Sequence, residues 1–150
     1  FELYQKLRSN PISLNEIVEK PTMLSLLPDL QGKKLLDLGC GTGGHLQLYL
    51  KRDAERVVGT DLSVKMLEQA EKDLQKCGQF SGCFSLYPLP MEKLSELPES
   101  DFDVITSSFA FHYIEDFPTL LAMIANKLKS NGTLVFSQEH PITTCHKEGR

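Results

Sequence analysis

Residues 34–44 read KLLDLGCGTGG, and this stretch decides the fold class and the kind of ligand. The apolar run at residues 34–38 predicts a short buried β-strand, and the glycines after it predict a tight turn into a helix. Glycine adopts positive φ angles and brings bare backbone N–H groups close to a ligand. The turn is therefore typical of a nucleotide or nucleoside site, although its spacing fits both G-x-G-x-x-G and G-x-G-x-G.

Asp37, two residues before the first glycine, separates two classes of ligand. A dinucleotide places a doubly charged pyrophosphate on such a loop and on the helix N-terminus behind it. A carboxylate at the strand tip repels that group and suits a ligand whose nearest part is cationic. The residue therefore favours a cationic cofactor, and an NAD-dependent oxidoreductase stays as the alternative.

The composition indicates one domain with a real hydrophobic core, since 41% of the 150 residues are apolar. The formal net charge is -4 and the basic residues are scattered, so nucleic acid is not an expected partner. The apolar run at residues 120–125 is too short to span a membrane. Because the four cysteines show no framework spacing, we expect reduced thiols and a cytoplasmic location.

The chain before the first strand is expected to be helical. Residues 13–16 form a capping box, with Ser13 as the N-cap and Glu16 reaching back. This helix is expected to stop near Pro21 and to be followed by one or two further turns that carry Met23, Leu24, Leu26 and Leu27. Residues 1–30 are thus predicted to be a helical N-terminal segment, and residues 31–150 one cofactor-binding core.

Apolar runs alternate with amphipathic helical stretches along the core. Further strands are expected at residues 56–61, 83–87, 102–107 and 133–137, with Asn131-Gly132 as the turn into the last. Helices are expected from the glycine loop to about Arg52, after a Ser63 cap, and with Pro118 in a first turn. This order predicts an α/β fold, a doubly wound parallel sheet with helices on both faces. Ligands of such sheets bind beyond the carboxyl ends of the strands.

Asp61 ends the second strand, 22 positions after Gly39. An acid at this spacing accepts hydrogen bonds from ribose hydroxyls. Dehydrogenases and methyltransferases share the feature, so it supports nucleoside binding without choosing between them.

Four segments together resemble the class I S-adenosylmethionine-dependent methyltransferases, in their small-molecule, type 11-like branch. They are LDLGCGTG at 36–43, VGTDLS at 58–63, FDVITSSFAFHY at 102–113 and LKSNGTL at 128–134. The resemblance covers about residues 20–140 and implies a Rossmann-like fold, S-adenosyl-L-methionine as cofactor and methyl transfer to a small molecule. A non-catalytic cofactor-binding module of the same fold is the other alternative.

The resemblance also implies a set of cofactor-binding residues. The glycine loop would line the methionine end with Asp37 near its ammonium group, Asp61 would hold the ribose, and Leu62 and Met66 would face the adenine. The family often has an acid where this chain has Pro90, which leaves Met91 and Glu92 to contact the adenine. The whole implied set is Asp37, Gly39, Cys40, Gly41, Gly43, Asp61, Leu62, Met66, Met91, Glu92 and Ser107.

Two histidines are candidate catalytic groups, His112 after the fourth strand and His140 after the fifth. Imidazole changes charge near neutral pH and can accept a proton from a hydroxyl, amine or thiol, although His112 also fits a packing role on an aromatic loop. His45, after the glycines, is expected at the surface. No metal is expected, because Glu139, His140, Cys145 and His146 fit no familiar zinc spacing.

The resemblance implies seven strands, whereas the chain stops after the fifth expected one. We therefore expect a C-terminally truncated core that lacks the final strand hairpin and one wall of the acceptor pocket.

Overall fold

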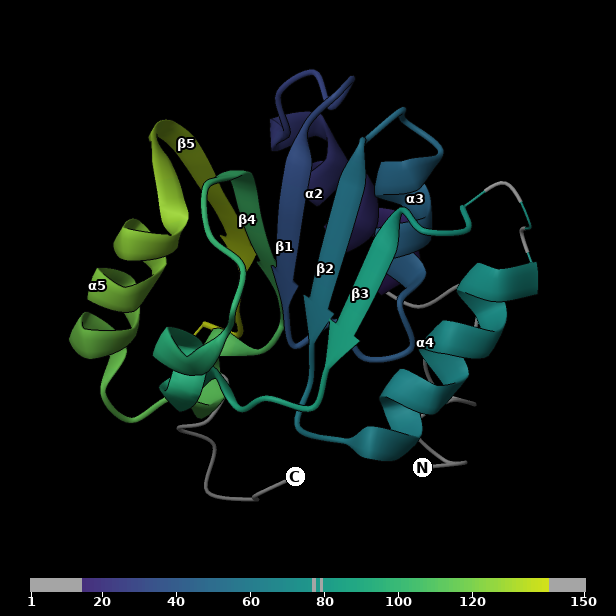
Figure 1. Cartoon of the computed structure of the whole chain (residues 1–150). Coiled ribbons are helices and arrows are strands. Elements are labelled where there is room, and N and C mark those ends of the chain that lie inside the picture. The colour runs from purple at the N-terminus through teal and green to yellow at the C-terminus, as the bar shows by residue number, and fades with distance from the viewer. Residues whose placement is uncertain (1–14, 77, 79, 141–150) are drawn as a thin grey trace.

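The computed structural model describes residues 15–76, 78 and 80–140. Its centre is a five-stranded sheet in the order β3-β2-β1-β4-β5, with every neighbouring pair parallel (Figure 1). The strands are β1 (Lys34–Leu38), β2 (Arg56–Thr60), β3 (Phe84–Tyr87), β4 (Phe102–Ser108) and β5 (Leu128–Ser137). The predicted doubly wound α/β fold is confirmed, and strand order reverses between β1 and β4.

Helices cover both faces of this sheet. One face carries η1 (Asn15–Glu19), α2 (Lys20–Leu26), α3 (Gly44–Leu50) and α4 (Val64–Lys76). The other carries η2 (Met91–Glu96), η3 (Phe111–Tyr113) and α5 (Phe117–Lys127), and Figure 1 shows α5 across the sheet from α3 and α4. Adjacent residues of β1 divide between the two layers, since Leu35 packs with the α3 side and Leu36 with the α5 side. A strand buried on both faces reads as a continuous apolar run, which is why β1 and β2 were found from the sequence.

The helical turns expected after Pro21 are present in α2, but Pro21 does not interrupt the helix before them. It lies in the first turn of α2, which runs on to Leu26, after a π-helical turn over η1. Proline fits the first turn because its missing N–H has no intrahelical acceptor there. The predicted cap at Ser13 lies outside the described residues.

β5 begins five residues earlier than predicted, at Leu128 instead of residue 133. Phe102 pairs with Leu128 and Val104 with Thr133, so the register is irregular between the two pairs. Gly132 lies within this irregularity, where an added Cβ would stand 2.8 Å from Leu128 Cδ2 and 3.0 Å from the Phe102 carbonyl oxygen. Asn131-Gly132 is therefore a bulge inside the strand and not a turn before it.

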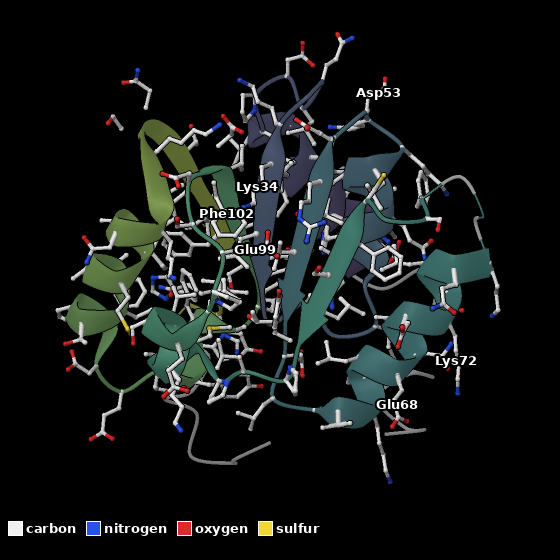
Figure 2. All side chains as sticks on the ribbon, viewed as in Figure 1. Lys34, Asp53, Glu68, Lys72, Glu99 and Phe102 are labelled. Atoms are coloured by element: carbon white, nitrogen blue, oxygen red, sulfur yellow. The ribbon has the colours of Figure 1, made fainter. Side chains whose placement is uncertain are left out.

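Polar and charged side chains gather around Glu99 near the starts of β1 and β2. We call them the Glu99 cluster (Glu99, Lys34, Arg56 and Tyr87). The Glu99 carboxylate accepts a bidentate pair from Arg56 at 3.0 and 3.1 Å and lies 3.1 Å from Lys34 Nζ. The Tyr87 hydroxyl donates to it at 3.2 Å. Lys34 Nζ also stands 4.7 Å from the centre of the Phe102 ring, and Figure 2 shows Lys34, Phe102 and Glu99 close together.

Within the part of the chain that the structure describes, no helix has the length and apolar character needed to cross a bilayer.

Candidate functional site

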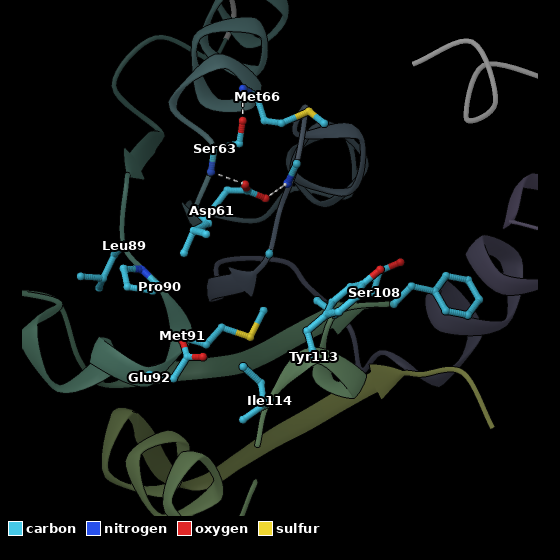
Figure 3. Close-up of a pocket in the computed structure, with 15 residues that line it drawn as sticks. Asp61, Ser63, Met66, Leu89, Pro90, Met91, Glu92, Ser108, Tyr113 and Ile114 are labelled. Carbon is cyan, nitrogen blue, oxygen red and sulfur yellow. Dashed lines mark hydrogen bonds between the residues drawn. The ribbon is translucent and has the colours of Figure 1, made fainter. Parts of the chain in front are cut away.

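A cavity of about 440 Å³ opens beyond the carboxyl ends of β1, β2 and β4, where the fold predicts a ligand (Figure 3). Seven of the predicted cofactor-binding residues line it: Gly39, Gly41, Asp61, Leu62, Met66, Met91 and Glu92. In Figure 3, Asp61, Ser63 and Met66 lie on one side of the space, with Met91, Glu92, Ile114 and Tyr113 across it.

The glycine loop depends on its glycines for conformation and for space. Gly39, Gly41 and Gly43 have φ angles of 72°, 56° and 75°, in the left-handed region. A Cβ on Gly39 would stand 2.9 Å from both Ala110 Cβ and Met91 Cε. Gly39 N–H also donates to the Thr60 carbonyl at 2.8 Å, which ties the loop to the end of β2. The loop is therefore held close to the segment that follows β4.

Asp61 is the most firmly placed polar group of the cavity. Its Oδ2 accepts from the Gly41 N–H and its Oδ1 from the Ser63 N–H, each at 2.8 Å. The predicted Ser63 cap of α4 is confirmed, since Ser63 Oγ accepts from the Met66 N–H at 3.4 Å. A carboxylate has about four lone-pair positions, so Asp61 can still accept from ligand hydroxyls.

The charges of the lining residues suit a cation better than a pyrophosphate. Asp61 and Glu92 are acidic, and among the described residues that line the cavity none is Lys or Arg. Bringing a diphosphate beside two carboxylates without a compensating cation is unfavourable, whereas a sulfonium or ammonium group is attracted. Apolar side chains supply a surface for a flat base, with Leu62 74% and Tyr113 78% exposed. The lining therefore fits a cationic nucleoside such as S-adenosylmethionine.

Asp37 lies behind the cavity and is not among its lining residues. Its side chain is 2% exposed, and its Oδ1 accepts from Thr106 Oγ1 at 2.7 Å on the neighbouring strand β4. The electrostatic argument made for Asp37 thus applies at the cavity wall to Asp61 and Glu92. Its contact with a cofactor ammonium group stays a prediction.

Three other residues of the predicted set also lie outside the lining. Burial, followed by the charges of Asp37 and Asp61, raises the pKa of the Cys40 thiol well above its usual value, so the thiol stays protonated. Ser107 is fully buried and donates from Oγ to the Leu38 carbonyl at 2.9 Å. Gly43 precedes α3, and a Cβ on it would stand 3.1 Å from Ala70 Cβ. Their roles toward a cofactor stay predictions.

The two candidate catalytic histidines are not brought together in the cavity. His112 lies in η3 beside Tyr113, with their ring centres 4.2 Å apart, and only Tyr113 is a lining residue. Within the described residues His112 Nδ1 is buried without a hydrogen-bond partner. His140 is exposed beyond the end of β5. The described residues contain no group of three potential metal ligands, and Cys145 and His146 lie outside them.

His45 is buried and not at the surface as expected. It is 8% exposed and stacks on Tyr49, with ring centres 6.0 Å apart, because α3 turns both rings inward. Burial and the charge of Asp37 raise the pKa of Tyr49 above its usual value.

Sequence reasoning missed most of the wall that follows β4. Ser108, Phe109, Ala110, Tyr113 and Ile114 line the cavity there. Phe109 has a φ of 50°, which is unusual for a residue with a side chain. These residues could have been predicted to line the site because they follow β4, which lies beside β1 where the strand order reverses. Ser63, Leu89 and Pro90 complete the lining.

Comparisons with known proteins agree with this architecture. The family model described as methyltransferase domain matches residues 36–136. An uncharacterized protein of Haemophilus influenzae is 85% identical over 149 residues, which are 99% of this chain and 59% of that protein. A malonyl-[acyl-carrier protein] O-methyltransferase of Gallionella capsiferriformans is 33% identical over 117 residues, 76% of this chain and 40% of that protein.

Solved structures give the same result. The crystal structure of an S-adenosylmethionine dependent methyltransferase from Mesorhizobium loti has a TM-score of 0.75 and 35% identity, over 87% of this chain and 57% of that one. A putative S-adenosylmethionine dependent methyltransferase from Listeria monocytogenes has a TM-score of 0.76 and 31% identity, over 88% and 63%. The chain thus spans less than two thirds of these relatives.

The comparisons support S-adenosylmethionine as the cofactor and do not favour the oxidoreductase alternative. Together with the parallel sheet, the left-handed glycine loop and the acidic cavity, they establish that the chain belongs to the class I S-adenosylmethionine-dependent methyltransferase family.

Proposed function

We propose that this chain forms the cofactor-binding core of an enzyme that transfers a methyl group from S-adenosylmethionine to a small-molecule acceptor. The observation that carries the proposal is the cavity beside the glycine loop, lined by two carboxylates and, among its described residues, by no basic side chain. The acceptor stays open, because the relatives differ in the compounds that their names give.

When bound, S-adenosylmethionine supplies a methyl group on a positively charged sulfur, which an acceptor atom displaces directly. The chain has to align the two partners and exclude water. In our proposal Asp61 accepts from the ribose, while Leu62 and Met66 pack on the adenine and Glu92 accepts from its amino group. The Gly39–Gly41 backbone follows the methionine end.

A general base is needed only when the acceptor atom arrives protonated. We assign that role to His112, because its ring centre lies 4.2 Å from that of the lining residue Tyr113 and imidazole can act as a general base. His140 is the second candidate, since it follows β5 and borders the same end of the sheet.

The organisation into residues 1–30 and 31–150 stays a prediction, with the N-terminal segment as a cover for the cofactor side. A cytoplasmic location is likewise proposed from the spacing of the cysteines.

Isothermal titration tests the proposed ligand. We expect S-adenosylhomocysteine to bind at least about tenfold more tightly than NAD, which corresponds to roughly 1.4 kcal/mol. Asp61→Asn, which removes one carboxylate from the cavity, should reduce this preference. Asp53→Asn is its charge control, because Asp53 is exposed, lies at the opposite end of the sheet from the cavity (Figure 2) and has a φ of 62° that Asn also adopts. Tighter binding of NAD would overturn the assignment. Transfer of a labelled methyl group, screened over alcohols, amines and carboxylic acids, then tests turnover.

A further inference from the structure

Glu19 joins the N-terminal helical segment to the carboxyl ends of β4 and β5. Its Oε1 accepts hydrogen bonds from Ser108 Oγ and from Ser137 Oγ, each at 2.6 Å. These two serines are register partners and the last residues of their strands. One carboxylate oxygen therefore ties together three elements that are 89 and 118 residues apart in sequence.

The same serines fix a left-handed turn in the cavity wall. Phe109 has a φ of 50°, and its N–H donates to the Ser137 carbonyl at 3.0 Å and to Ser137 Oγ at 3.2 Å. A residue with a side chain keeps such a φ only where its surroundings impose it. Ser137 is thus held by Glu19 on one side and holds Phe109 on the other.

The turn then reaches the glycine loop. Ser108, Phe109 and Ala110 all line the cavity, and Ala110 Cβ is one of the two atoms that leave no room for a side chain at Gly39. A shift of this turn would change the distance between the β4 wall and the glycine loop. Because residues of both the turn and the glycine loop line the cavity, such a shift would change the shape of the cavity.

We propose that Glu19 is a positioning residue for this wall. Its carboxylate accepts hydrogen bonds from Ser108 and Ser137, and Ser137 in turn accepts the Phe109 N–H. The resulting turn places Ala110 next to Gly39 of the glycine loop. The consequence for ligand binding rests on the proposed function, in which the adenosine end lies at Asp61 and the amino-acid end passes the wall formed by residues 108–110.

The choice of a carboxylate has a physical reason. An ionised oxygen accepts two hydroxyl hydrogens in short, strong bonds. The amide oxygen of Gln can accept both but carries no charge, whereas Ala leaves both hydroxyls without this acceptor. Glu19→Gln is therefore the conservative variant and Glu19→Ala the disruptive one.

Amide hydrogen exchange of the ligand-free chain tests the contact itself. We expect the Phe109 amide to exchange about tenfold faster in Glu19→Ala, the effect of losing hydrogen bonds to a charged group. Glu19→Gln should stay within about threefold of the original chain. Glu16→Ala is the control, because Glu16 lies on the same segment but bonds Lys20 at 3.0 Å. Unchanged exchange at Phe109 in Glu19→Ala overturns the proposal.

Should Glu19→Ala fail to fold, Ser137→Ala gives the same test. It removes the hydroxyl between Glu19 and Phe109 and keeps the carbonyl that also accepts from Phe109. Faster exchange confined to residues 108–111 supports the proposal, and unchanged exchange there refutes it.

Two nucleosides of different length separate positioning from a general structural role. We expect Glu19→Ala to weaken S-adenosylhomocysteine about tenfold and methylthioadenosine, which lacks the amino-acid end, less than about twofold. Equal losses for both probes would mean a general loss of structure and would count against a positioning role. If the original chain binds neither probe, the proposed function fails, while the exchange result still decides the role of Glu19.

Discussion

The two ends of the parallel sheet hold their carboxylates in different ways. At the starts of the strands Glu99 is bound by Arg56 and Lys34, and Asp103 accepts from Lys129 at 2.8 Å. At the carboxyl ends Asp61 is held by two backbone N–H groups and Glu19 by two serine hydroxyls. A cation cancels the charge that it binds, whereas neutral donors fix a carboxylate and leave its negative potential in place. The carboxylates at the first end thus stabilise the fold, whereas at the other end Asp61 keeps its charge for a ligand.

The largest test of this contrast is the removal of Asp61. Asp61→Ala deletes the acceptor of two backbone N–H groups and the proposed ribose partner, so S-adenosylhomocysteine affinity should fall about 100-fold, given roughly 1.5–3 kcal/mol for each hydrogen bond to a charged group. Asp61→Asn should lose less, because its amide oxygen still accepts one bond. Titration calorimetry measures both variants. An affinity within threefold of the original would mean that Asp61 serves the loop alone.

Removal of Glu99 should damage stability without affecting the ligand. Glu99→Ala leaves Arg56, Lys34 and the Tyr87 hydroxyl without a shared acceptor, and we expect a loss of about 2 kcal/mol in the free energy of unfolding. Urea denaturation measures it, with Glu96→Ala as the control, since Glu96 is exposed and lies 3.7 Å from Lys93. Unchanged stability would remove the distinction between the two ends of the sheet.

The pH dependence of unfolding tests the same comparison. The hydrogen bonds from Arg56 hold the pKa of Glu99 below its ordinary value of 4.5. A carboxyl group with a lowered pKa in the folded state binds protons more readily when unfolded, so its contribution is present above pH 4.5 and is lost as the pH falls through the folded pKa. Unfolding measured between pH 6 and pH 3 should therefore show a shallower pH dependence in Glu99→Gln. Parallel curves for both proteins would contradict this account.

The smallest effect is expected on the exposed surface of α4. Lys76 pairs with Asp73 at 2.7 Å, but its side chain is 72% exposed and water competes for the contact. Lys76→Ala should change the free energy of unfolding by less than about 0.5 kcal/mol, and added salt should reduce the difference further. A loss as large as that of Glu99→Ala would show that burial is not what separates the two ion pairs.

The positions of the elements followed closely from local sequence, whereas their ends did not. Strands buried on both faces need continuous apolar runs, and β1 and β2 have them. From the sequence, Pro21 was interpreted as the end of a helix and Gly132 as part of a turn, which are the commonest roles of these residues. Their actual roles depend on a π-helical turn before Pro21 and on the close approach of β4 to Gly132, and neither is encoded in the neighbouring residues.

The site was predictable where the backbone defines it and less so where side chains do. Ser107, a predicted cofactor residue, donates to the Leu38 carbonyl, whereas its neighbour Ser108 lines the cavity. Successive residues of a strand face opposite sides, and the sequence alone does not show which of the two serines faces the cavity. Asp37 is buried and accepts a hydrogen bond from Thr106. His45 was expected at the surface and is buried, stacked on Tyr49. The bond from Glu19 to Ser137 spans 118 residues, and no local pattern indicates it.

By itself, the sequence determined the family, the parallel sheet and the glycine loop with Asp61. Left-handed turns favour glycine and buried strands need apolar runs, so short stretches of residues encode these features. Only the tertiary structure decided which side chains form the cavity wall and how the N-terminal segment reaches it. Those contacts depend on strand register and on packing between distant segments, which the folded chain alone brings together.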